Sequence, residues 1–314
     1  MSDELIINNV GEFYDSLEMI APPDTILVGV TKKLEVFWRQ FPIGFCKKTG
    51  KTLDKFRHKV FGAKDILLTE YGVDNVRKNE NEYRWLYNEL SDLKSKKTLL
   101  CLLQFRATAN YEVLHKESDN LGNQYFDPDI IKFNKEEIFV DCGGYIGDTT
   151  DQFIEHVGNF NKIYLYEPNP VNYDEAIVNL SKWGKSLSDK IICRKAGVGR
   201  DNKIQKISIE GACSKISIDG NSDVDVVALD ADIKESVTFI KMDIEGSEID
   251  ALMGAKKHLL SEKPKLAICV YHKPDDLWEI PKLILKLNPS YNIYLRQYKY
   301  GDGLNAFDTV LYAV

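Results

Sequence analysis

The chain has 314 residues, with 41 Lys and Arg against 48 Asp and Glu, which gives a formal net charge of −7. This length allows two domains, and the acidic balance, without a Lys or Arg run longer than a pair, argues against a nucleic-acid binder. No apolar run approaches the ~18 residues of a membrane-spanning helix, and the acidic start is unlike a signal peptide. The cysteines form no C-x-x-C pair, so we expect reduced thiols and a cytoplasmic protein.

Residues 1–75 have the pattern of a small Rossmann-like α/β domain. A strand is predicted over 24–29, part of a helix at 36–38 and a second strand near 43–45. Only Gly29 stands where a phosphate-binding loop needs several glycines. We therefore favour a βαβ unit that binds no nucleotide over a second nucleotide site.

A helical bridge is predicted over residues 76–124, between this domain and a third segment at 125–314. One helix has apolar residues at the i, i+3, i+4 and i+7 positions, namely Tyr83, Leu86, Tyr87 and Leu90. A second apolar helix is predicted near 99–105. These side chains are expected to form core or a seam between domains.

A glycine-containing loop follows an apolar strand at 138–140 and precedes a predicted helix that begins at Thr149. Glycines there allow backbone N–H groups to approach a ligand closely. The alternative is a turn that only packs the helix on the strand. The residues predicted to contact a cofactor are Asp141, Gly143, Gly144, Tyr145 and Gly147.

A second strand, 163–166, ends in Glu167 and Pro168 about twenty residues after the loop. Open α/β folds place at this point the carboxylate that holds ribose hydroxyls. The loop lacks the G-x-G-x-x-G of a dinucleotide site, and the acid at Asp141 disfavours a pyrophosphate. S-adenosylmethionine has a sulfonium, an amino group and a ribose but no phosphate, so we favour it over NAD.

Further strands are predicted over 191–196, 239–243 and 265–271, with helices between them. One helix is expected to be capped by Ser247 and to run until Pro264, and another contains Pro281, which should kink it or mark a late start. Strands near 291–297 and 309–314 are predicted to form a hairpin. The pattern predicts an α/β fold with a seven-stranded, largely parallel sheet, a terminal antiparallel hairpin and ligands at its carboxyl edge.

Between the third and fourth strands, residues 206–230 alternate polar and apolar side chains, as half-exposed strands do. This insertion has two possible roles. In the first it covers the cofactor or shapes the acceptor pocket, and in the second it is a surface β-arm without a ligand. Both alternatives remain open.

Four sequence blocks resemble the FkbM-type methyltransferase family over roughly residues 125–314. They are Asp-Cys-Gly-Gly-Tyr-Ile-Gly at 141–147, Tyr-Glu-Pro-Asn at 166–169, the block with Met-Asp-Ile-Glu-Gly-Ser-Glu at 240–248, and Tyr-His-Lys-Pro at 271–274. The resemblance implies the Rossmann-like class I methyltransferase fold, S-adenosylmethionine as methyl donor, and O-methylation of a hydroxyl, often on a sugar or polyketide. Tyr145 departs from the broader class I pattern, which often has glycine there. The resemblance adds Ser214 to the predicted cofactor contacts, and Ala196 is placed among them at the third strand end.

Methyl transfer to a hydroxyl requires in-line alignment and a group that accepts the proton. Asp243 and Glu245 end the fourth strand and His272 follows the fifth, so all three should converge at the carboxyl edge as catalytic candidates. Asp243 is also counted among the cofactor contacts, because we expect it to face the donor or acceptor rather than to do chemistry. His272 is predicted to be the general base, because an unperturbed imidazole titrates near neutrality. The same three residues are a plausible magnesium site, but no ligand spacing demands it and we assign no metal.

The sequence therefore predicts an S-adenosylmethionine-dependent O-methyltransferase that acts on a small-molecule or glycan acceptor, with a carbohydrate hydroxyl favoured. An NAD-dependent oxidoreductase and a non-catalytic cofactor-binding or assembly protein are the alternatives. No nucleic acid or membrane span is expected. The sequence pattern names neither the acceptor nor the oligomeric state.

Overall fold

The structure is a computed structural model that describes residues 9–17, 71–108, 111–210, 213–216, 222–299 and 308–314. The chain divides into two compact units, one of 1–88, 92–118 and 299–306 and the other of 89–91, 119–298 and 307–314. The predicted strand, helix and strand between 24 and 45 lie outside the described residues.

The described part of the first unit is helical. Its helices are α1 (Val10–Leu17), α4 (Val73–Lys78), α5 (Glu80–Glu89), α6 (Leu93–Thr108) and α7 (Tyr111–Lys116). The helices predicted from apolar spacing correspond to α5 and α6, which bury Tyr83, Leu86 and Leu99. None of the helices in the described ranges is long and apolar enough to cross a membrane.

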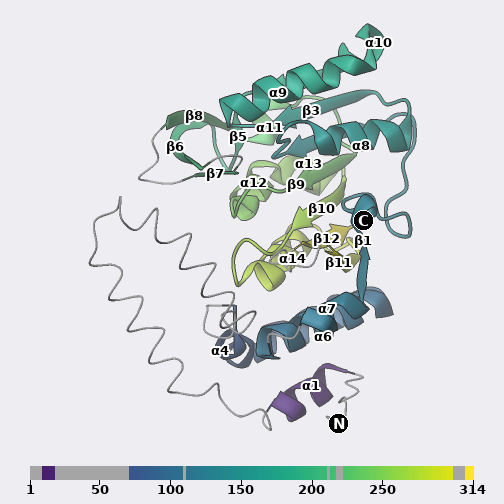
Figure 1. Cartoon of the computed structure of the whole chain (residues 1–314), viewed down its shortest axis with the longest axis vertical. Coiled ribbons are helices and arrows are strands. Elements are labelled where there is room, and N and C mark those ends of the chain that lie inside the picture. The colour runs from purple at the N-terminus through teal and green to yellow at the C-terminus, as the bar shows by residue number, and fades with distance from the viewer. Residues whose placement is uncertain (1–8, 18–70, 109–110, 211–212, 217–221, 300–307) are drawn as a thin grey trace. The chain divides into compact units, whose positions relative to one another are not determined.

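The second unit is built on an eight-stranded sheet (Figure 1). Its strands are β1 (Ser118–Asn120), β2 (Ile138–Cys142), β3 (Lys162–Tyr166), β4 (Ile191–Arg194), β9 (Phe239–Met242), β10 (Lys265–Cys269), β11 (Ile293–Lys299) and β12 (Thr309–Ala313). The order across the sheet is β1-β11-β12-β10-β9-β2-β3-β4. The predicted sheet of seven strands is thus present, with the three-residue β1 added at one edge.

Strand direction follows the predicted pattern. The pairs β10/β9, β9/β2, β2/β3 and β3/β4 are parallel, whereas β12 runs antiparallel between β10 and β11. All five residues of β2 and β12 are buried, as expected for strands covered on both faces. The carboxyl ends of β2, β3, β9 and β10 therefore meet at one edge of the sheet.

Aromatic side chains dominate the core on one face of this sheet. The Phe139 ring stacks on Phe153 of α8 (Asp148–Val157) at 4.5 Å between centroids and on Phe239 at 4.9 Å. Phe126 packs against the same three rings. This stack fixes β2, β9 and α8 relative to one another, and with them the loop between β2 and α8.

The remaining helices of the unit are α9 (Pro170–Leu180), α10 (Lys185–Ser188), α11 (Leu229–Asp232), α12 (Glu248–Gly254), α13 (Lys256–Ser261) and α14 (Asp276–Leu287), with 3₁₀ turns η2 (Leu121–Asn123) and η3 (Ser181–Trp183). The single helix predicted from Ser247 is two helices, because Ala255 leaves the helical conformation. Ser247 makes no side-chain capping bond, contrary to the prediction. Pro281 lies inside α14 rather than at a late start.

The insertion forms a small separate sheet in the order β5-β8-β6-β7. Its strands are β5 (Gly197–Val198), β6 (Lys203–Glu210), β7 (Cys213–Ile216) and β8 (Ser222–Val227). Within residues 206–230 the predicted strands are confirmed where the structure describes the chain, and the segment ends in the helical turn α11.

Candidate active site

The loop after β2 has the conformation that its glycines predict. Gly143, Tyr145 and Gly147 have φ angles of 79°, 46° and 83°. A Cβ atom at Gly143 would lie 1.9 Å from the carbonyl oxygen of Asp243, and one at Gly144 would lie 2.3 Å from Leu165 Cγ. The first two glycines are therefore required because the loop packs directly on its neighbours.

Most backbone N–H groups of this loop are used inside the protein. Those of Gly143 and Gly144 both donate to the Tyr166 carbonyl at 3.0 Å, and that of Gly147 donates to the Gly144 carbonyl at 2.7 Å. The N–H of Tyr145 donates to Glu167 Oε2 at 2.9 Å. A phosphate would find these N–H groups already bonded, while the predicted cofactor contacts of the loop residues stay a prediction.

Glu167 lies at the end of β3 and is 5% exposed. Besides the Tyr145 N–H, it accepts a bond from the Asn169 N–H at 2.8 Å. Burial raises the pKa of Glu167, although these bonds oppose the shift. The next residue, Pro168, is partly buried, and Asn169 then caps α9. The structure thus holds the Glu167 carboxylate rigidly beside the glycine loop.

Asp141 forms a buried ion pair with Lys241. Its Oδ1 lies 3.1 Å from Lys241 Nζ, and the side chains are 0% and 2% exposed. Asp141 Oδ2 accepts a bond from Thr150, and Lys241 also donates to the Gly143 carbonyl at 2.7 Å. Lys241 therefore balances the negative charge of Asp141. We expected this charge to face a cationic ligand, and the ion pair corrects that expectation.

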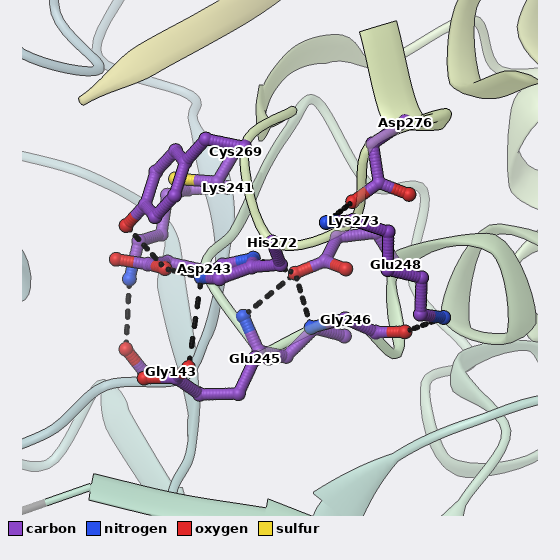
Figure 2. Close-up of polar contacts among 12 residues, drawn as sticks. Gly143, Lys241, Asp243, Glu245, Gly246, Glu248, Cys269, His272, Lys273 and Asp276 are labelled. Atoms are coloured by element: carbon purple, nitrogen blue, oxygen red, sulfur yellow. Dashed lines mark hydrogen bonds and ion pairs between the residues drawn. The ribbon is translucent and has the colours of Figure 1, made fainter. Parts of the chain in front are cut away.

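The predicted convergence of Asp243, Glu245 and His272 is confirmed (Figure 2). His272 Nε2 lies 3.2 Å from Asp243 Oδ1 and 3.8 Å from Glu245 Oε2. The other ring nitrogen, Nδ1, lies 2.8 Å from Glu248 Oε1. Carboxylates therefore flank both nitrogens of an almost buried imidazole.

These neighbours change the protonation of His272. Burial lowers its pKa, but the bonds to Asp243 and Glu248 outweigh that effect and raise the pKa to about 10. The ring is then a cation at neutral pH. This raised pKa contradicts the expectation that His272 titrates near neutrality, which is the reason for assigning it as the base.

Asp243 is held as an anion. It accepts bonds from the Tyr125 hydroxyl at 2.9 Å and the Tyr271 hydroxyl at 3.2 Å, in addition to His272. Burial raises its pKa, but the His272 bond and the Lys241 charge lower it well below the usual range. With its oxygens engaged, Asp243 is a poor proton acceptor.

The segment between β9 and α12 turns sharply around Glu248. Glu245 and Gly246 have φ angles of 55° and 93°. The same Glu248 Oε1 that bonds His272 accepts the N–H groups of Ile244 at 3.1 Å and Gly246 at 3.3 Å. This turn leaves the Glu245 side chain 42% exposed, as the outermost carboxylate of the cluster.

The other predicted site residues have the following positions. Ala196 is buried between β4 and β5. Ser214 lies in β7 opposite Ile209 in the register, and its side chain is outside what the structure describes. Tyr145 is 38% exposed, with its backbone bonded to Glu167.

Sequence reasoning did not identify four residues that shape the site, namely Tyr125, Lys241, Glu248 and Tyr271. A signal existed for Lys241, a lysine inside an otherwise apolar strand. In the part of the chain that the structure describes, no group of three or more His, Cys, Asp or Glu side chains is arranged to hold a metal ion.

From β4 to β11 the sheet is parallel except for β12, which lies antiparallel between β10 and β11, and a glycine loop follows β2. These features define the Rossmann-like fold of class I methyltransferases. The chain belongs to the FkbM methyltransferase family, because the model of the "Methyltransferase FkbM domain" matches residues 141–300.

A solved structure supports this assignment. The crystal structure of methyltransferase FkbM from Methylobacillus flagellatus KT is 30% identical, with a TM-score of 0.70, over 79% of this chain and 61% of that one. The chain thus spans less than two thirds of that relative's length. No curated protein matches the chain.

Two other solved structures are less similar. An rRNA methylase from Streptococcus thermophilus is 17% identical over 58% of this chain and 87% of its own, with a TM-score of 0.36. SMU.1697c of Streptococcus mutans, solved in complex with SAH, is 14% identical over 57% of this chain and 89% of its own, with a TM-score of 0.34.

Proposed function

We propose that the chain transfers a methyl group from S-adenosylmethionine to a hydroxyl group of a carbohydrate. The observation that carries the choice of cofactor is the internal use of the N–H groups of Gly143, Gly144 and Tyr145. The pyrophosphate of NAD needs such donors, whereas the ammonium group of S-adenosylmethionine, which NAD lacks, needs acceptors. This favours S-adenosylmethionine over NAD.

The proposed cofactor site has two parts. Glu167 is buried and accepts bonds from two backbone N–H groups and from the Asn172 side chain, but a carboxylate has about four lone-pair sites, so one remains for a ribose hydroxyl. The glycine loop and the end of β9 are in direct contact, so the methionine part would lie beside Asp243. When bound, the cofactor supplies a methyl group on a positively charged sulfur.

The carbohydrate acceptor is supported by the polar groups at the same edge. Glu245 is the exposed carboxylate of the cluster and can accept bonds from sugar hydroxyls, while the exposed Tyr145 ring offers a flat apolar face. His272 and Asp243 would orient the acceptor through their fixed charges. The net charge of −7 argues against a nucleic-acid acceptor.

The location that we propose is the cytoplasm. Four described cysteines, Cys101, Cys142, Cys193 and Cys269, are free thiols, two of them buried. Free thiols of this kind are usual in reducing compartments.

The test is methyl transfer by the full chain from S-adenosylmethionine labelled in its methyl group. The acceptor panel includes sugar nucleotides, oligosaccharides, an amine, a thiol and an RNA. We expect label on a carbohydrate oxygen, located by mass spectrometry. Label only on the amine, thiol or RNA would overturn the acceptor class, and cofactor binding without transfer to any of them would favour a non-catalytic protein.

A further inference from the structure

One carboxyl group at the active edge is absent from the predicted site, namely that of Asp308. It immediately precedes β12, whose register pairs Cys269 with Val310, and the Val270 N–H donates to the Thr309 carbonyl at 3.1 Å. Continuing this antiparallel register by one residue places Asp308 opposite Tyr271. Asp308 therefore lies at the carboxyl end of β10, where the His272 cluster begins.

The side chain of Asp308 is one of a few described carboxylates with a buried oxygen that has no hydrogen-bond partner, a feature it shares with Asp141 and Glu248. In Asp308 this oxygen is Oδ2. A buried acceptor without a donor is costly, so such atoms in native structures call for an explanation, and a catalytic role is one of those known. Burial, followed by the nearby charge of Asp243, raises its pKa to about 6.

The described titratable groups around Asp308 come from three strands. Asp243 follows β9, and Tyr271 follows β10 and is influenced by the Asp308 charge. On β11, the Tyr298 N–H donates to the Asp308 carbonyl at 3.0 Å, while the Tyr298 hydroxyl pairs with Tyr312. None of these described groups neutralises Asp308.

The other groups of the cluster are less suited to accept a proton. His272 already carries one, and Asp243 is held ionised by three donors. Glu248 Oε1 accepts two backbone bonds in addition to His272. The Oε2 atom of Glu248 is also buried without a hydrogen-bond partner, but this carboxylate is paired with the His272 cation. Asp308 has such an oxygen at the same edge and pairs with none of the groups described around it.

We propose that Asp308 is the proton acceptor of methyl transfer, an inference that rests on the proposed function. In this step the acceptor's hydroxyl oxygen forms the new bond to the methyl carbon. The carbon–sulfur bond breaks, and its electron pair goes to sulfur, which becomes a neutral thioether. The hydroxyl proton passes to Asp308 Oδ2 and leaves to solvent when product is released.

The first test requires no acceptor. S-adenosylmethionine has a sulfonium and S-adenosylhomocysteine has a neutral sulfur, while their other ionisable groups are the same. An ionised Asp308 beside the reacting sulfur would attract only the former. Calorimetry on the full chain should show the affinity ratio of the two ligands shifting about three- to tenfold toward S-adenosylmethionine between pH 5 and pH 7.5.

Asp308→Asn should remove this pH dependence while S-adenosylhomocysteine still binds. The matched control is Asp276→Asn, because burial raises the pKa of Asp276 to about 6 as well, but its Oδ2 accepts a bond from the Lys273 N–H. The control should keep the pH dependence. A dependence retained in Asp308→Asn, or lost in Asp276→Asn, would overturn the assignment of Asp308.

If neither ligand binds the wild-type chain, the proposed function fails and this role fails with it. If both bind with a ratio that does not change with pH, only the role of Asp308 fails. With a carbohydrate that is methylated, Asp308→Asn should lower kcat by about 10²–10⁴-fold without a comparable change in KM. A variant that keeps a tenth of wild-type kcat would contradict the proposal.

Discussion

Replacing Lys241 by Met should destabilise the protein strongly. The Lys241 ammonium lies 3.1 Å from Asp141 Oδ1, and both side chains are almost completely buried. Without it, Asp141 keeps only the Thr150 hydroxyl as a hydrogen-bond partner, and the Gly143 carbonyl loses a donor. Removing one member of a buried ion pair costs about 3–5 kcal/mol. We therefore expect a loss of that size in the free energy of unfolding.

Urea unfolding, followed by fluorescence and circular dichroism, measures this loss. The control is Arg200→Met, which breaks an exposed ion pair of similar length, 3.0 Å to Asp250, and should cost about 1 kcal/mol or less. Adding Asp141→Asn to Lys241→Met should recover part of the stability, because the unpaired charge is gone. Equal losses in Lys241→Met and Arg200→Met would show that burial does not set the energetic contribution of the Lys241 ion pair.

The pH dependence of this variant has a definite sign. Burial raises the pKa of Asp141, and without Lys241 it rises further. A carboxyl with a raised folded-state pKa favours folding at low pH and loses that contribution as pH rises through the folded value. The free energy of unfolding that Lys241→Met loses relative to wild type should therefore be smaller at pH 5 than at pH 8.

Three further predictions concern the glycine loop, the cofactor and the histidine. Gly143→Ala should lower the free energy of unfolding in urea more than Gly158→Ala does. Both glycines have positive φ, but a Cβ atom at Gly158 meets nothing within 4 Å, so equal losses would show that packing at Gly143 is not the cause. Glu167→Ala should raise the dissociation constant of S-adenosylhomocysteine about tenfold or more by calorimetry, since bonds to a charged acceptor contribute about 1.5–3 kcal/mol, and unchanged affinity would exclude that contact. His272→Gln should lower the free energy of unfolding more at pH 6 than at pH 10. The protonated His272 ring stabilises the folded state fully below the pKa of histidine in the unfolded chain, and this contribution is lost as pH rises to the folded-state pKa of about 10. A loss independent of pH would contradict the cationic ring.

The order and type of the strands in the second unit could be predicted because local sequence determines them. An apolar run followed by glycines, as at β2 and its loop, needs no knowledge of distant residues. The convergence of Asp243 and His272 also followed from sequence, since parallel strands end at a common edge.

The charge pairing at that edge could not be predicted. Asp141 and Lys241 face each other because the register of β2 against β9 aligns them, and this register joins residues 100 positions apart. The raised pKa of His272 depends on a turn with two positive φ angles that brings Glu248 back to the ring. Hydrophobic periodicity fixes neither the register nor that turn.

The choice of S-adenosylmethionine as cofactor is tested by calorimetric titration of the full wild-type chain with S-adenosylhomocysteine and, separately, with NAD. Most N–H groups of the glycine loop are bonded internally and the buried Glu167 carboxylate lies beside it, so we expect S-adenosylhomocysteine to bind with one-to-one stoichiometry and NAD not to bind. Binding of NAD without binding of S-adenosylhomocysteine would contradict the account.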